Sequence, residues 1–77
     1  MGQINSYVGL IESAKTDRNG TISAINLRTD DGKTHYVDRL RSFPELLGHV
    51  GWRAKLTGYS KVEQGVSIIE LIEFEIL

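Results

Sequence analysis

The chain has 77 residues, which allows one domain with a single small core and leaves little room for an enclosed active-site cavity. Nine Lys and Arg balance ten Asp and Glu, so no overall field would draw the protein to nucleic acid or to an anionic membrane, and any such affinity must come from a local patch. The absence of cysteine excludes disulfides, thiolate metal sites and cysteine nucleophiles. These bounds favour a binding module over an enzyme.

The N-terminal residues lack a basic segment followed by an apolar core, and no apolar run approaches the length of a membrane span. A chain without cysteine also fits a reducing compartment. We therefore expect a cytoplasmic protein, with no membrane partner, that forms one domain over residues 1–77.

The first predicted strand runs from Ile4 to Lys15, where apolar and polar residues mostly alternate. Gly9 lies inside it, and a glycine within a strand usually marks a bulge or a bend, as is needed when one strand serves two sheets of a closed barrel. A loop of three residues, Arg18 to Gly20, ends this hairpin arm.

The second predicted strand spans Thr21 to Thr29. The preceding loop places two pairs of residues opposite each other: Thr16 with Ile22, and Ala14 with Ala24. The apolar phase slips by one residue at Ala24 and Ile25, which predicts a bulge there.

The third predicted strand, Lys33 to Arg39, follows a loop at residues 30–32, and two registers compete. If all three residues are loop, the inner pairs are Ile25 with Val37 and Leu27 with His35, and the outer pairs are Asn26 with Tyr36 and Arg28 with Thr34. If only Asp31 and Gly32 form the turn, Tyr36 lies inside opposite Leu27. We favour the first register because it buries two β-branched residues against each other.

A short helix is predicted next, because the periodicity changes after Arg41. Ser42 is a good N-cap, Glu45 lies three residues on as in a capping box, and Gly48 supplies a stop. The expected buried side consists of three apolar residues: Phe43, Leu46 and Leu47.

The stretch from Val50 to Leu77 reads as a hairpin with a three-residue loop at Glu63 to Gly65. This register places charged residues on one face, pairing Lys55 with Glu73 and Arg53 with Glu75. On the other face it pairs apolar residues: Trp52 with Ile76, Ala54 with Phe74, and Leu56 with Ile72.

A meander of three strands, a short helix and a final hairpin resemble the oligonucleotide/oligosaccharide-binding fold, or OB-fold. The stretches that carry the likeness are YVGLI at residues 7–11, DGKTHYV at 31–37 and GWRAKLTGY at 51–59. The resemblance implies a mainly β, five-stranded Greek-key barrel with the helix between the third and fourth strands. An SH3-like barrel is the competing fold, and the helix before the last hairpin argues against it.

In OB-folds the usual ligand surface is the outer face of strands two and three, framed by the loops between strands one and two and strands four and five. On this sequence that surface includes Tyr36, Arg28 and Asn26, with Arg18 on one rim and Lys61 on the other. A tyrosine beside an arginine suits base stacking and phosphate contact, so single-stranded DNA or RNA is the expected ligand class. The carboxylates that crowd the same region argue against it: Asp17, Asp30, Asp31, Asp38 and Glu63.

The alternative is a protein-interaction or homodimer module. The hairpin register turns Tyr59, Ile69 and Leu71 outward, which predicts an exposed apolar patch that contacts a protein partner or a second copy of the chain. Neither His35 nor His49 has the neighbours that catalysis or metal binding requires, so we expect no metal, no cofactor and no enzymatic activity.

Overall fold

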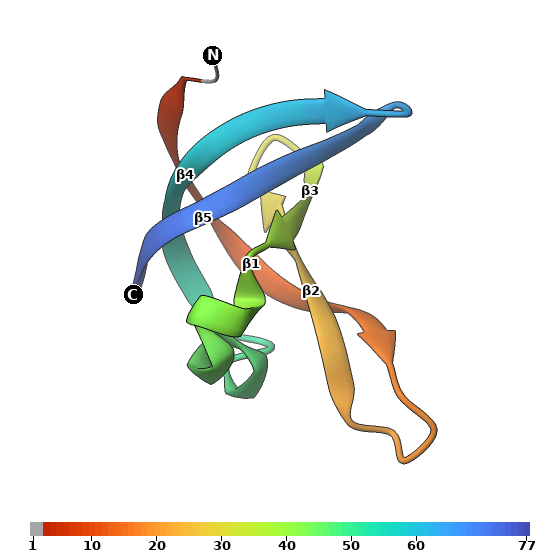
Figure 1. Ribbon diagram of the computed structural model, residues 1–77. Coiled ribbons are helices and arrows are strands. Elements are labelled where there is room, and N and C mark those ends of the chain that lie inside the picture. Colours follow the sequence, from red (N-terminus) through yellow and green to blue (C-terminus); the bar gives the residue numbers. More distant parts are fainter. Residues whose placement is uncertain (1–2) are drawn as a thin grey trace.

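The computed structural model describes residues 3–77, which form a closed barrel of five strands. The elements follow in chain order: β1 Ile4–Thr16, β2 Ile22–Thr29, β3 Thr34–Asp38, the 3-10 turns η1 Leu40–Ser42 and η2 Pro44–Gly48, β4 Arg53–Glu63 and β5 Val66–Ile76. Around the barrel the strand order is β1-β2-β3-β5-β4, with β3 and β5 parallel and all other pairs antiparallel (Figure 1). This architecture is mainly β, as predicted, and is consistent with an OB-like fold.

β1 closes the barrel because it pairs with β4 along its first half and with β2 along its second half. Gly9 lies where the two pairings meet, opposite Thr29 on one side and Ala54 on the other. A Cβ atom at this position would overlap the carbonyl oxygen of Arg28. β1 thus serves two pairings at Gly9, as the sequence predicted, and the glycine permits a close approach of two backbones there.

The β1–β2 arm has the predicted loop at residues 18–20 and the predicted pair of Thr16 with Ile22. The predicted pair of Ala14 with Ala24 is wrong, since Lys15 takes the place opposite Ala24. Two register shifts, one on each side of Lys15, absorb the slip in apolar phase. They leave two successive residues, Ala24 and Ile25, both buried.

The β2–β3 register is the one that we favoured. Asn26 lies opposite Tyr36, Leu27 opposite His35, and Arg28 opposite Thr34. Leu27 and Val37 are buried in the core, and Tyr36 between its buried neighbours points outward.

The predicted short helical segment lies between β3 and β4, but it forms two 3-10 turns, and the predicted capping box is wrong. Ser42 ends the first turn, and Phe43 is the N-cap of the second without a side-chain hydrogen bond. Eight or nine residues hold an α-helix only marginally, whereas single 3-10 turns are common as connectors. Leu46 is fully buried as predicted, and Phe43 and Leu47 pack half-buried against the core.

The predicted β4–β5 register is wrong in two places. The loop has two residues, Gln64 and Gly65, both with positive φ (52° and 78°), which pairs Glu63 with Val66 as in a type I′ hairpin. A second register shift between Thr57 and Gly58 leaves Ile72 as an extra residue on β5.

The two errors have different consequences on either side of Ile72. Beyond the bulge they add to a shift of two residues, so the predicted faces are correct but every partner differs: Lys55 faces Glu75, Leu56 faces Phe74, and Ala54 faces Ile76. Between the loop and the bulge the shift is one residue, which reverses the faces of β5. The predicted ladder of Lys55 with Glu73 and Arg53 with Glu75 is also wrong.

Ile69 and Leu71 therefore point into the barrel, where they are 0% and 1% exposed. The expectation that both form an exposed patch with Tyr59 is wrong, because the sequence does not reveal the bulge at Ile72. Tyr59 itself lies outward, opposite Glu70, and is 36% exposed. Among residues 3–77, no helix has the length and apolar character needed to cross a membrane.

Candidate nucleic-acid interface

The candidate site centres on the outer surface of β2, β3 and the first half of β5. Cross-strand pairing places Asn26, Tyr36 and Ile68 side by side in one row, which Glu12 extends on β1 and Lys61 on β4. We call this surface the Tyr36 face. The tips of the β1–β2 arm and the β4–β5 hairpin extend on the same side of the barrel as β3 (Figure 1), so the two loops frame this face.

A hollow of about 350 Å³ lies beside Tyr36, where β3 runs into the first 3-10 turn. Its lining comes from β2, β3 and η1, and consists of Ser23, Tyr36, Val37, Asp38, Arg39, Leu40, Arg41 and Ser42. The hollow thus joins an outward aromatic ring to two arginines. Arg39 and Arg41 were not assigned to the site from the sequence. The sequence shows only that two arginines lie two positions apart at the end of the third predicted strand.

Arg39 has a left-handed backbone, with φ 70° and ψ 29°. Such a conformation is unfavourable for a residue with a long side chain and persists only where its surroundings hold it. Two contacts do so here: the Asp38 carboxylate accepts a hydrogen bond of 2.8 Å from the Arg39 amide, and the Arg39 guanidinium donates one of 2.9 Å to Glu70. The strained residue therefore carries its guanidinium across to β5.

Lys61 lies on the other side of Glu70. Its ammonium group is 3.5 Å from the Glu70 carboxylate and 3.0 Å from that of Glu63. The hydrogen bond to Glu63, with a smaller contribution from Glu70, raises the pKa of Lys61 above its ordinary value. Lys61 is thus a firmly protonated cation at the edge of the Tyr36 face.

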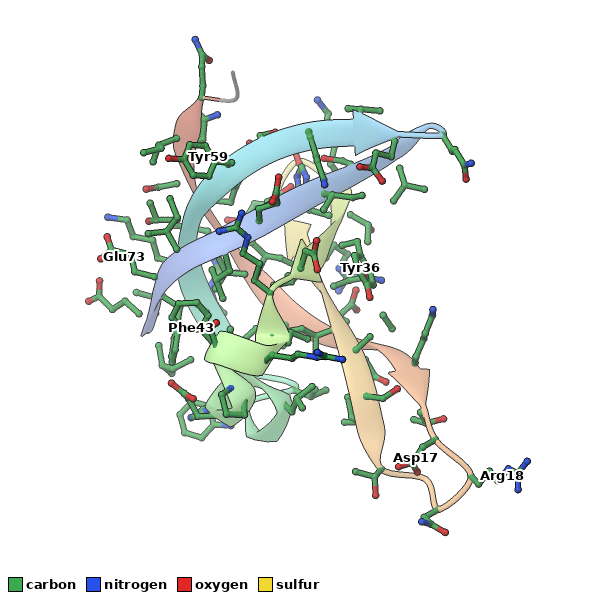
Figure 2. All side chains as sticks on the ribbon, viewed as in Figure 1. Asp17, Arg18, Tyr36, Phe43, Tyr59 and Glu73 are labelled. Atoms are coloured by element: carbon green, nitrogen blue, oxygen red, sulfur yellow. The ribbon has the colours of Figure 1, made fainter. Side chains whose placement is uncertain are left out.

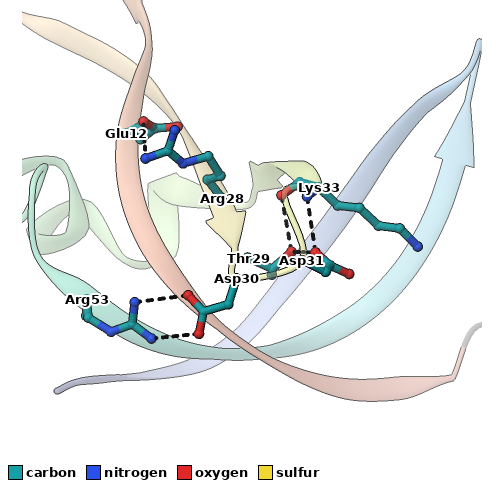
Figure 3. Close-up of polar contacts among 7 residues, drawn as sticks. All are labelled: Glu12, Arg28, Thr29, Asp30, Asp31, Lys33 and Arg53. Atoms are coloured by element: carbon teal, nitrogen blue, oxygen red, sulfur yellow. Dashed lines mark hydrogen bonds and ion pairs between the residues drawn. The ribbon is translucent and has the colours of Figure 1, made fainter.

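Arg28 and Asn26 lie on the face where the sequence predicted them. The Arg28 guanidinium is 3.6 Å from the Glu12 carboxylate across the β1–β2 pair, as Figure 3 shows, and both side chains remain well exposed. Asn26 lies between Glu12 and Tyr36 in the same row.

Arg18 stands apart from these residues. It occupies the tip of the β1–β2 arm, and Figure 2 shows its side chain extending into solvent away from Tyr36. The loop is ordered by Asp17, whose carboxylate accepts hydrogen bonds from the amides of Asn19 and Thr21 (2.9 and 3.0 Å). The structure therefore brings together Tyr36, Asn26, Arg28 and Lys61, and leaves Arg18 as an outlying cation.

A second group of charges lies at the β2–β3 loop. Arg53 donates two hydrogen bonds of 3.1 Å to the Asp30 carboxylate, a bidentate pair that lowers the pKa of Asp30 (Figure 3). The Asp31 carboxylate accepts bonds from the Thr29 hydroxyl and the Lys33 amide, and these lower its pKa. Both aspartates have roles in shaping this loop, which accounts for two of the carboxylates that crowd the region.

The two histidines have separate environments. His35 is 7% exposed, packs against the ring of Tyr7 with 4.9 Å between centroids, and shares a 2.7 Å hydrogen bond with the Ser67 hydroxyl. Burial lowers the pKa of His35. His49 bonds the Glu45 carbonyl and meets the edge of Trp52. Residues 3–77 contain no cluster of three or more His, Asp or Glu that could hold a metal ion.

The fold and this surface define the class to which the protein can be assigned: a small closed β-barrel with a mixed-charge outer face around an aromatic residue. Comparison of the chain with protein families, with curated proteins and with solved structures finds no match.

Proposed function

We propose that the protein is an OB-like module that binds single-stranded nucleic acid on the Tyr36 face. The observation that carries the proposal is the hollow beside an outward tyrosine, with Arg39 and Arg41 on its rim. Single-strand binders combine an aromatic platform for a base with cations that follow the phosphates, and the hollow beside Tyr36 joins the two.

Each residue has a distinct role in the proposal. Tyr36 stacks a base, and Asn26, beside it in the row, hydrogen-bonds a base edge. Arg41 meets a phosphate directly, because it takes part in no ion pair within residues 3–77. Arg28 and Lys61 contact further phosphates after leaving their carboxylate partners.

The test is a fluorescence anisotropy titration of labelled oligonucleotides of about 12 nucleotides, DNA and RNA, at several salt concentrations. Tyr36→Ala should weaken binding by about 1 to 3 kcal/mol, because a base loses its stacking platform. Tyr36→Phe keeps the ring and should keep most of the affinity. Tyr59→Ala is the matched control, since it removes an outward tyrosine that does not line the hollow.

Two outcomes would reject the proposal. One is the absence of binding at low salt, where the electrostatic contribution is largest. The other is equal affinity of the wild-type protein and Tyr36→Ala, which would place any binding elsewhere.

A protein contact remains the second candidate function, on a patch smaller than the sequence predicted. Ile4 and Tyr59 lie opposite each other on β1 and β4 and are 58% and 36% exposed. If this pair binds a second copy of the chain, Tyr59→Asp should convert a dimer to a monomer with the barrel intact. A wild-type protein that sediments as a monomer at high concentration would count against self-association.

A further inference from the structure

Glu70 occupies the place on the Tyr36 face where two cations converge. It lies on β5 between β3 and β4, opposite Asp38 on one side and Tyr59 on the other. Its carboxylate accepts the 2.9 Å hydrogen bond from Arg39 and lies 3.5 Å from the Lys61 ammonium. The two cations come from different parts of the chain, so the fold itself assembles this arrangement.

The geometry is that of an anion site already filled by a carboxylate. A guanidinium and an ammonium converging on one group of oxygens is also how proteins hold phosphate. Arg39 keeps an unfavourable left-handed backbone while its guanidinium reaches Glu70. The hollow beside Tyr36 includes Arg39 in its lining, so a ligand in the hollow meets the same guanidinium.

A purely structural role explains this arrangement poorly. Ion pairs between exposed side chains contribute only about 0 to 1 kcal/mol to stability, and all three side chains here are at least 24% exposed. Glu70 also lies directly opposite Asp38, and like charges in facing positions of a sheet are unfavourable. Stability alone therefore does not explain a glutamate opposite Asp38.

We propose that Glu70 is an internal competitor for phosphate, which holds Arg39 and Lys61 until a phosphodiester group of the bound strand displaces it. This inference rests on the proposed function and adds its regulation: Glu70 sets the affinity and the salt dependence of the face. In the free protein the two cations are neutralised, which matches a chain with no overall positive charge. On binding, the carboxylate turns to solvent and the phosphate takes both cations.

The decisive variant is Glu70→Gln, which keeps the shape of the side chain and removes its charge. We expect binding of a labelled single-stranded oligonucleotide to tighten by about fivefold at low salt, because one unit charge close to a phosphate is worth about 1 kcal/mol in water. The salt dependence should steepen by about one phosphate contact. Free inorganic phosphate at the same ionic strength should compete more strongly against Glu70→Gln than against the wild-type protein if the cation pair binds phosphate from any source.

Glu73→Gln is the matched control. Glu73 lies on the same strand beyond the bulge, opposite Thr57, and its replacement makes the same change in net charge without touching Arg39 or Lys61. A gain seen equally in Glu70→Gln and Glu73→Gln would be a general charge effect and would overturn the competitor role. That result would leave the proposed function standing, provided that binding still depends on Tyr36.

A double substitution gives a second test. With Arg39→Gln in place, Glu70→Gln should add clearly less affinity than it does in the wild-type background, because only Lys61 is left for it to release. A full gain in the Arg39→Gln background would contradict the inference. Silence of the wild-type protein and of Glu70→Gln at low salt would reject the inference together with the proposed function.

Discussion

Two mixed-charge outer surfaces of the barrel differ in how their charges are arranged. On the Tyr36 face a carboxylate is shared by two cations beside an outward ring and a hollow of about 350 Å³. On the opposite side, which Figure 2 marks by Glu73, β4 and the second half of β5 form a surface that we call the Lys55 face. There Lys55 lies opposite Glu75 but forms no ion pair with any residue from 3 to 77.

The difference shows which feature distinguishes a candidate site from a solvated surface. The Lys55 face also has a hollow, but of about 180 Å³, lined by Lys55, Thr57, Glu73, Phe74 and Glu75. Its only aromatic residue, Phe74, turns inward to pack edge-on against Phe43. Charges of both signs are therefore common to the two surfaces, and the outward ring with cations from separate elements belongs to the Tyr36 face alone.

The bulge at Ile72 separates the two faces on β5, and the largest predicted effect tests it. Ile69→Asp places an unpaired charge in the core and should lower the free energy of unfolding by about 4 kcal/mol or more, enough to unfold most of the protein. The register expected from the sequence alone gives the opposite result, a folded protein with a changed surface. Circular dichroism and urea denaturation measure the outcome.

Ile72→Asp is the control for this prediction. Ile72 is 39% exposed at the bulge, so its replacement should change the free energy of unfolding by no more than about 1 kcal/mol. Similar losses in the two variants would show that the bulge does not lie at Ile72.

The next effect concerns the glycine opposite the bulge. A Cβ atom at Gly58 would overlap the backbone carbonyl of Glu70, which cannot move without disturbing the strand that carries both faces. Gly58→Ala should therefore lower the free energy of unfolding by about 1 to 3 kcal/mol. Gly48→Ala is the control, because nothing lies within 4 Å of its Cβ position, and its effect should stay within about 1 kcal/mol. Equal effects in urea denaturation would contradict the close approach at Gly58.

The two hairpins show how far the sequence could predict the fold. At residues 30–32 the loop chemistry and the burial of Val37 favour the same register, and the β2–β3 pairing is the predicted one. At the β4–β5 loop, Gln64 takes positive φ, which few residues other than glycine and asparagine favour. The sequence therefore favoured a three-residue loop, in which only Gly65 needs positive φ. The bulge at Ile72 adds a second residue to the shift, so the charged and apolar residues beyond it still lie on the predicted faces. The sequence pattern therefore did not reveal the error in the loop.

The candidate site also has one part that the sequence could predict and one part that it could not. The outward position of Tyr36 follows from strand register and could be predicted. Arg39 could not, because its left-handed backbone accompanies a contact with Glu70, 31 residues further along the chain. Local sequence carries no signal for such a contact, which exists only after the parallel β3–β5 pair has formed.

A pair of single-cation substitutions compares the faces directly. Arg41→Ala removes the unpaired arginine from the rim of the hollow and should lower the slope of log affinity against log salt by about 0.7, the value of one phosphate contact with a single strand. Lys55→Ala makes the same change in net charge on the Lys55 face and should leave the slope unchanged. Equal slopes for the two variants would mean that the bound strand does not distinguish the faces.

The smallest expected effect is a pH dependence of stability that comes from His35, inside the barrel. His35 bonds Ser67 and so links β3 to the start of β5 from inside the barrel, with Tyr7 against its ring and Asp31 and Lys33 as the nearby charges. Burial lowers its pKa below the ordinary 6.5, so the unfolded chain takes up the proton more readily than the folded one. Its contribution to stability is therefore complete above pH 6.5 and is lost as the pH falls from there toward the folded pKa.

The pKa values of Asp30 and Asp31 are also lowered, but these carboxylates act in a separate pH range. Their contribution to the stability of the fold begins to be lost only as the pH falls to their ordinary pKa of 3.8. Melting temperatures measured between about pH 5 and 8 should thus fall toward acid in the wild-type protein and fall less in His35→Gln. His49→Gln removes the other histidine and should keep the wild-type slope. Hydrogen exchange near pH 5 should show the earliest loss of protection in the β3–β5 pair, because the bond from His35 to Ser67 joins these two strands. If the melting temperature of His35→Gln depends on pH as steeply as that of the wild-type protein, the acid sensitivity comes from another group.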